Sequence, residues 1–293
     1  MTAAALFNVA ITFWHPAAIS SLSREFASRR GFVISLHGTG GSMGETLGPI
    51  LVGSLLGVIS WRLVLQGSVI PGLVFGLMIW AFLRTIPAGN SSGSSVSGYL
   101  GSVAALLRNG RLLLVLIFAA GFAGGQSTVL TFLPIYLDED LGASSVTIGL
   151  YLSLAQVGGI VSQPLMGFAS DRLGRKLILV PSLAILGLSF IGLSIAPSGW
   201  MFGLVVLVMG AFLFPLMSIL LASAMDLVVL GAQATTVSLV FGSAIVVSAF
   251  APALAGVLAD SIGTEAAFIF GAGLVLSVSL LSAVTNWRPR AAG

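Results

Sequence analysis

The sequence predicts an all-α membrane protein, a polytopic helical bundle of about nine transmembrane helices. Its composition carries that prediction, because 57% of the 293 residues are hydrophobic and only 7% are charged. Soluble domains carry roughly a quarter charged residues, so this chain cannot cover a water-facing surface. The mean hydropathy of +1.11 agrees. The apolar runs are continuous and about twice as long as the roughly ten-residue strands of a membrane barrel, so we expect helices.

Each expected span is an apolar run of about 20 residues, the length that crosses the hydrocarbon core of a bilayer. The breaks between runs carry turn residues, as in LDEDLGAS, APSG and SIGTEA. The expected spans are 3–22, 32–57, 63–83, 112–137, 146–168, 177–196, 200–225, 235–258 and 266–286.

The basic residues predict the orientation of these spans. All of them except Arg62 fall in segments that would share one side of the membrane. The positive-inside rule places that side, and the C-terminus, in the cytoplasm. We therefore expect a multi-pass protein of a bacterial inner (plasma) membrane. An odd number of spans then leaves the N-terminus outside with nothing to hold it there. We expect that three helices are missing before Met1, through a wrong start or a true fragment.

One long loop, 84–111, interrupts the series of spans. Its core, PAGNSSGSSVSG, is rich in Gly and Ser, which is typical of a flexible linker. The loop separates three expected spans in 1–83 from six in 112–293. We expect two helical bundles joined by a cytoplasmic linker, the first bundle being short by three helices.

Several function classes are excluded or disfavoured by composition. The chain has no cysteine, so disulfides, thiolate metal sites and thiol catalysis are excluded, and two histidines do not suggest a metal site. A net charge of +3 without a basic, aromatic-rich face does not indicate nucleic-acid binding. No GxxxxGK[ST] loop is present, so ATP is not the expected energy source. No pairing of Ser with His, or of two acids, at depth suggests an enzyme, and we expect no cofactor.

The stretch GFASDRLGRK, 167–176, concentrates charge in Asp171, Arg172, Arg175 and Lys176. Gly167 would allow close helix packing, and Gly174 would permit a tight turn between two long helices. Asp171 lies about one turn before the next span, where a helix N-terminus favours an anion. Plain anchoring by basic residues is the alternative, but anchoring needs neither an Asp nor fixed glycines.

This stretch resembles the signature G-x-x-x-D-R-x-G-R-R/K of the major facilitator superfamily, and it matches at every defined position. The resemblance implies the major facilitator fold, here without its first three helices. It also implies that 167–176 is a gating loop, the copy that follows the eighth helix of a complete member. Such a loop would pair with neighbouring cytoplasmic helix ends when that side is closed.

A second stretch, GTGGSMGETLGPILVG, 38–53, resembles the G-x-x-x-G-P-x-x-G-G motif of the superfamily's antiporter branches. Gly44, Gly48, Pro49 and Gly53 match, whereas Val52 replaces one glycine. Pro49 should bend the helix because it removes a backbone hydrogen bond. Glycines at 40, 44 and 48 would form a flat packing face. A plain packing seam and a role in conformational change both remain open.

Polar residues inside the spans are candidates for the transport site. Glu45 is the only acid deep within an expected span, where a carboxylate is costly and is by default functional, so it could carry a proton. His37 could line the same cavity, and Gln126 and Gln156 are candidate substrate contacts. A neutral hydrogen-bonded Glu, a structural His and simple interhelical hydrogen bonds are the alternatives. Asp226 is interpreted as a gate or anchor group.

These features predict a secondary transporter of small organic molecules, working by proton-coupled efflux and alternating access. FWHPAA, which contains His15, resembles the fosmidomycin-resistance drug-efflux branch of the superfamily. The alternatives are an importer or facilitator of a small metabolite, or an inactive truncated fragment. The expected partners are a small-molecule substrate, protons or another coupling ion, and membrane lipid, but no nucleic acid.

Overall fold

The computed structural model describes residues 2–56, 58–84, 96–229 and 231–287, and this part of the chain is helical apart from short turns. Contacts between Cα atoms divide the chain into two units. The larger unit comprises Met1–Ser42 with Val103–Gly293, and the smaller comprises Met43–Ser102. Each unit is described by itself below.

The helices follow the predicted order of apolar runs. In chain order they are α1 (Thr2–Glu25), the 3-10 turn η1 (Ala27–Arg29), α2 (Arg30–Leu56), α3 (Trp61–Gly67), α4 (Val69–Leu83), α5 (Val96–Leu107), α6 (Gly110–Ile135), the π-helical turn η2 (Tyr136–Asp140), α7 (Ser145–Leu173), α8 (Arg175–Ile195), α9 (Trp200–Met225), α10 (Gln233–Ile262) and α11 (Glu265–Val284). The all-α prediction is confirmed.

Seven stretches of the described chain are long and apolar enough to cross a membrane. They are α3 with α4, α6 with η2, and each of α7 to α11. The chain is therefore an integral, multi-pass membrane protein. The seven do not include α1 and α2, which coincide with the first two expected spans and are 24 and 27 residues long. Both carry polar residues inside them, such as His15 and Glu45.

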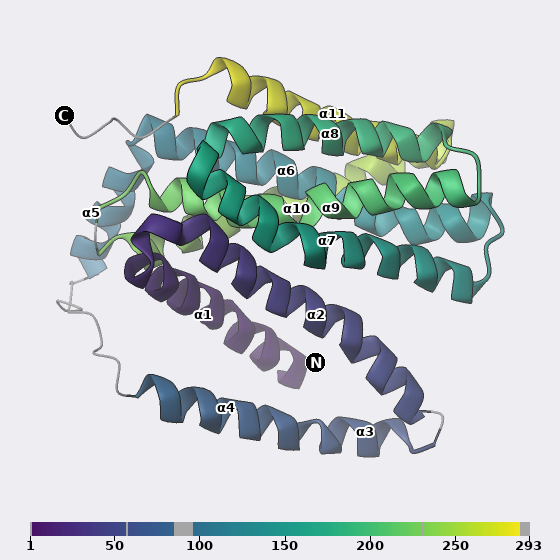
Figure 1. Cartoon of the computed structure of the whole chain (residues 1–293), viewed down its shortest axis with the longest axis horizontal. Coiled ribbons are helices and arrows are strands. Elements are labelled where there is room, and N and C mark those ends of the chain that lie inside the picture. The colour runs from purple at the N-terminus through teal and green to yellow at the C-terminus, as the bar shows by residue number, and fades with distance from the viewer. Residues whose placement is uncertain (1, 57, 85–95, 230, 288–293) are drawn as a thin grey trace. The chain divides into compact units, whose positions relative to one another are not determined.

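Helices α6 to α11 lie side by side as a bundle in the larger unit (Figure 1). The helix pairs α7 with α9, α10 with α6, and α11 with α8 make the main contacts. Large side chains such as Phe118, Phe190 and Phe268 are fully buried between them. Small residues bring the backbones together: a β-carbon on Gly210 would collide with the backbone of Ala155. This is the small-residue packing expected of helices in lipid.

The smaller unit holds the second half of α2, with α3, α4 and part of α5. The expected span 63–83 is interrupted at Ser68, between α3 and α4. Pro71 has no backbone N–H to bond the Gly67 carbonyl, which explains a break one turn before it. At the break itself, the Ser68 hydroxyl donates a hydrogen bond to the Leu65 carbonyl at 2.7 Å.

The sequence predicted one long loop over 84–111 with a flexible Gly/Ser-rich core, but the second half of this segment is largely helical. Helix α5 occupies Val96–Leu107, and α6 already begins at Gly110. The Gly/Ser content of 87–98 predicts a loop, but the residues that follow include apolar side chains at helical spacing, in YLGSVAALL. Residues 85–95 lie outside the described residues. The division into 1–83, 84–111 and 112–293 remains a prediction.

Candidate functional site

The turn between α7 and α8 is shorter than the sequence suggested. Helix α7 continues to Leu173 and α8 begins at Arg175, so Gly174 alone separates them, with φ +98°. A β-carbon is strained in that left-handed region, and the predicted role of Gly174 as a tight-turn residue is confirmed. Gly167 and Asp171 consequently lie on the last two turns of α7 rather than in a loop.

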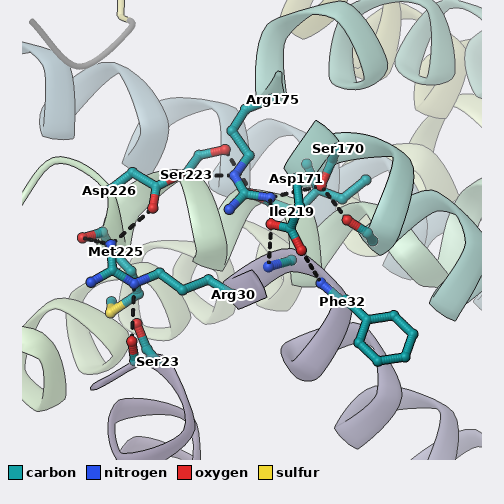
Figure 2. A network of polar contacts seen from close by, with 12 residues as sticks. Ser23, Arg30, Phe32, Ser170, Asp171, Arg175, Ile219, Ser223, Met225 and Asp226 are labelled. Atoms are coloured by element: carbon teal, nitrogen blue, oxygen red, sulfur yellow. Dashed lines mark hydrogen bonds and ion pairs between the residues drawn. The ribbon is translucent and has the colours of Figure 1, made fainter. Parts of the chain in front are cut away.

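Asp171 binds the start of a helix, but a different helix from the one expected. Its Oδ1 accepts a hydrogen bond from the Gly31 N–H at 2.8 Å, and its Oδ2 accepts one from the Phe32 N–H at 2.7 Å (Figure 2). These N–H groups begin α2, where no intrahelical acceptor exists and the helix dipole favours an anion. Because α7 continues past Asp171 to Leu173, Asp171 lies within α7 and does not cap the start of α8.

Arg175 continues this contact towards α9. Its Nη1 forms an ion pair with Asp171 Oδ1 and donates to Ser170 Oγ at 2.8 Å. Its Nε donates to Asp226 Oδ2 at 2.9 Å. The side chains of Asp171 and Arg175 are only 6% and 12% exposed, so this is a largely buried pair.

Arg30 approaches Asp226 from the other side. Its Nη1 donates to Asp226 Oδ1 at 2.9 Å, and its Nε donates to the Ser23 carbonyl of α1 at 3.0 Å (Figure 2). We call Arg30, Asp171, Arg175 and Asp226 the gating network, after the gating role that the resemblance of 167–176 predicts. It joins α1 and the start of α2 to α7, α8 and the end of α9.

Sequence reasoning did not include Arg30 among the site residues. A signal was present, because a cation at a helix N-terminus is disfavoured by the helix dipole and needs an acidic partner. The interpretation of Asp226 as a gate or anchor group agrees with its position between two arginines.

Beneath the network, α2 crosses α7 at very short range. A β-carbon on Gly167 would lie 2.5 Å from both the Gly31 carbonyl oxygen and Ser35 Oγ. A β-carbon on Gly31 would collide with the Arg175 guanidinium. The predicted close packing at Gly167 is therefore present, and Gly31 is its partner.

A second set of contacts between α2 and α7 lies one to two helical turns further along α2. Gln163 is 2% exposed, and its Nε2 donates to Ser42 Oγ at 2.9 Å. A β-carbon on Gly38 would lie 2.6 Å from Gln163 Oε1. The face of α2 that meets α7 thus carries small residues at positions 31, 35, 38 and 42, which is helical spacing.

The packing face expected at glycines 40, 44 and 48 stays a prediction. A β-carbon on Gly40 would meet no atom within 4 Å, and the same holds for Gly44 and Gly48. Helix α2 continues through Pro49 and Gly53 to Leu56. The surroundings of Pro49 and Gly53 lie outside what the structure describes, and the bend stays a prediction.

Two charged residues of the motif do not join the gating network. The Arg172 guanidinium lies 4.3 Å from the centre of the Phe168 ring, on the surface of α7. Lys176 Nζ donates to the Thr285 carbonyl at 2.9 Å and so caps the C-terminal end of α11, where a cation is favoured. Both contacts stay inside the bundle of α6 to α11.

His37 is part of an aromatic cluster between α1, α2 and α10. The centre of its ring lies 5.9 Å from that of His15 and 6.3 Å from that of Trp14. His15 in turn lies 5.4 Å from Phe241 of α10. The sequence had not suggested that the two histidines meet.

The remaining predicted residues are spread over three helices. Gln126 is half-buried on α6 and Gln156 is half-buried on α7, whereas the Glu45 side chain is exposed on the part of α2 that belongs to the smaller unit. Within the described residues, no group of three or more His, Asp or Glu side chains could hold a metal ion. The transport roles of these three residues stay predictions.

A family model described as Major Facilitator Superfamily matches residues 1–138 and 115–292 of this chain. The multidrug resistance protein MdtG of Salmonella paratyphi C is 26% identical over 189 residues, which cover 62% of this chain and 46% of that protein. The multi-drug resistance efflux pump PmrA homolog of Lactococcus lactis is 29% identical over 183 residues, 59% of this chain and 44% of that protein. This chain therefore matches less than half the length of either relative.

Two further similarities involve sugar transport proteins. The raffinose permease of Escherichia coli is 38% identical over 61 residues, 21% of this chain and 14% of that protein. The crystal structure of the E. coli fucose:proton symporter FucP superposes with a TM-score of 0.71 at 15% identity, covering 88% of this chain and 69% of that chain. The second match shows a shared fold.

Proposed function

Because the chain belongs to the major facilitator superfamily, we propose that it is a secondary transporter that exports small organic molecules by alternating access, driven by protons. The gating network is the observation that carries this proposal. It ties α1 and the start of α2 to α7, α8 and α9 through charged groups, as a gate between two moving parts would. The names of the MdtG and PmrA relatives support export.

The gating network would hold one side of the transporter closed. The positive-inside prediction makes this the cytoplasmic side. Opening would pull the α2 N-terminus away from Asp171 and separate Arg30 from Asp226. A gate of this kind needs to bias the two conformations by only a few kcal/mol, which lies within reach of a largely buried ion pair and two hydrogen bonds to a carboxylate.

Proton coupling would use Glu45, with His37 in the same pathway. Glu45 is the acid deep within an expected span, where a carboxylate is by default functional. His37 lies beside His15 and Trp14, and His15 lies beside Phe241 of α10, so a proton taken up there would change the charge between α1, α2 and α10. Gln126 and Gln156 would supply neutral contacts to the substrate.

The test is transport by the protein reconstituted in lipid vesicles, with ethidium as the probe and an imposed pH gradient. We expect the gradient to drive ethidium movement and ethidium to drive proton movement in return. Glu45→Gln should abolish the coupled proton movement, whereas Glu25→Gln, the same change at the exposed end of α1, should leave it intact. Unchanged coupling in Glu45→Gln would remove Glu45 from the mechanism.

Import of a small metabolite is the second candidate, and the match to the raffinose permease favours it. Radiolabelled raffinose in the same vesicles distinguishes the two candidates. Raffinose accumulation along the proton gradient, without ethidium movement, would support import. If a correctly folded protein moves neither compound under any gradient, neither candidate is supported for these two compounds.

A further inference from the structure

A cavity of about 770 Å³ lies beside the gating network in the larger unit. It is formed where α6 begins and α9 ends, next to the residues that follow α11. Its polar lining comprises Arg108, Asn109, Arg111, Asp226 and Asn286. Neither the motif nor the proposed transport pathway uses the two arginines.

The cavity carries two positive charges that no carboxylate balances. Within the described residues, the ion pairs involve Arg30 and Arg175 but neither Arg108 nor Arg111. Among the described residues that line the cavity, Asp226 is the only acid, and its two oxygens already accept hydrogen bonds from Arg30 and Arg175. Its charge is thus compensated from the gate side and would not exclude an anion from the cavity.

The neutral lining groups are engaged with the protein. Asn109 Oδ1 caps α6 by accepting from the Arg111 and Leu112 N–H groups at 3.2 and 3.3 Å. Asn109 Nδ2 donates to the Leu227 carbonyl at 3.4 Å. The first turn of α6 is therefore already capped by Asn109. The groups in the cavity whose charge is not balanced are the guanidinium groups of Arg108 and Arg111.

We infer that this cavity binds a phosphate group, carried by the headgroup of an anionic phospholipid. Guanidinium groups match phosphate oxygens in geometry and charge, often with two hydrogen bonds each. Arg111 lies on the first turn of a membrane-crossing stretch, Gly110–Asp140, which is the depth of lipid headgroups. Basic pockets between membrane helices bind such headgroups. Leu114 lies one turn deeper and offers an apolar surface to the lipid.

This inference does not depend on the direction or coupling of transport. The experiment measures the thermal unfolding midpoint of the purified protein in detergent, with phosphatidylglycerol or phosphatidylcholine added. We expect phosphatidylglycerol to raise the midpoint by at least about 2 °C, because a ligand that binds only the folded state stabilises it. Phosphatidylcholine, which has no net charge, should have little effect.

The variant Arg108→Gln with Arg111→Gln should lose the shift, whereas the control Arg84→Gln should keep it. Arg84 follows α4, stacks over Trp80 and lies on the same predicted side of the membrane. If the double variant does not fold, each single variant should still bind phosphatidylglycerol about tenfold more weakly in native mass spectrometry, since each loses one charge-assisted contact.

A parallel titration with inorganic phosphate identifies the source of the anion. A shift with phosphatidylglycerol alone supports the lipid headgroup. An equal shift with millimolar inorganic phosphate, lost in the arginine variants, would assign the cavity to free phosphate and overturn the lipid assignment. Equal phosphatidylglycerol shifts in the parent protein and in both the double and single arginine variants would overturn the site itself.

Discussion

Replacing Asp171 with Asn should open the gate, and the size of the effect follows from three contacts. Asp171 accepts two backbone hydrogen bonds from α2 and pairs with Arg175, while only 6% of its side chain is exposed. Asn has one carbonyl oxygen, so at least one bond to α2 is lost together with the charge. A hydrogen bond to a charged group contributes about 1.5–3 kcal/mol.

Removing one member of a buried ion pair costs about 3–5 kcal/mol, but Arg175 keeps Asp226 and the cost is smaller here. We therefore expect Asp171→Asn to shift the balance between closed and open forms by about 2–3 kcal/mol. At about 1.4 kcal/mol per factor of ten, this corresponds to roughly a 30- to 150-fold increase in the open form relative to the closed form.

A thiol at position 35 reports this shift. Ser35 is fully buried against Gly167, and its Oγ has no hydrogen-bond partner within the described residues, so Ser35→Cys should cost little. The natural chain has no cysteine, so this thiol reacts alone. Its reaction rate with a membrane-impermeant reagent, added on the predicted cytoplasmic side, should rise at least about tenfold with Asp171→Asn.

The matched control is Asp138→Asn in the same background, because Asp138 is an exposed acid in η2, beyond the C-terminal end of α6 and away from the gating network. The rate should not change in that variant. If Asp171→Asn also leaves the rate unchanged, Asp171 does not hold the gate closed and the reasoning from its contacts is refuted.

Three further predictions concern the contact of α2 with α7 and the turn after α7. Gly167→Val should speed the same thiol reaction, because its β-carbon would lie 2.5 Å from the Gly31 carbonyl oxygen; an unchanged rate would contradict the close crossing. Gln163→Leu removes the bond to Ser42, at a cost of about 1 kcal/mol, and should speed the reaction about fivefold. Gly174→Ala should cost about 1–2 kcal/mol at φ +98° and lower the thermal unfolding midpoint; an unaltered midpoint would contradict the strain.

Much of the fold was predictable because a helix that crosses a lipid bilayer needs a long run of apolar residues. Apolar runs of about 20 residues gave the positions of most helices, and Gly174 marked the tight turn between α7 and α8. Helix α5 was not predicted, because it follows directly on a Gly/Ser-rich tract that is typical of a loop. Its 12 residues are also too short to cross a membrane.

The sequence pointed to Asp171, Arg175 and Asp226 of the gating network, but not to the partners of the two acids at the start of α2. The motif pointed to Asp171 and Arg175, but the partners of Asp171 on α2 lie 140 and 139 residues away and are backbone N–H groups. A pattern of side chains in the sequence does not reveal which backbone N–H groups will bind Asp171. Arg30 and Asp226 are 196 residues apart, and their pairing depends on the start of α2 lying beside the end of α9. Spacing along one helix cannot give such distances.

The most direct measurement locks α2 to α7 across the gate. The ring centres of Phe32 and Phe168 lie 6.4 Å apart, so Phe32→Cys with Phe168→Cys places two thiols at this interface in a chain without other cysteines. Ethidium transport in vesicles is then measured before oxidation, after oxidation and after reduction. We predict that the cross-link stops transport and that reduction restores it. Undiminished transport by fully cross-linked protein would contradict the gate.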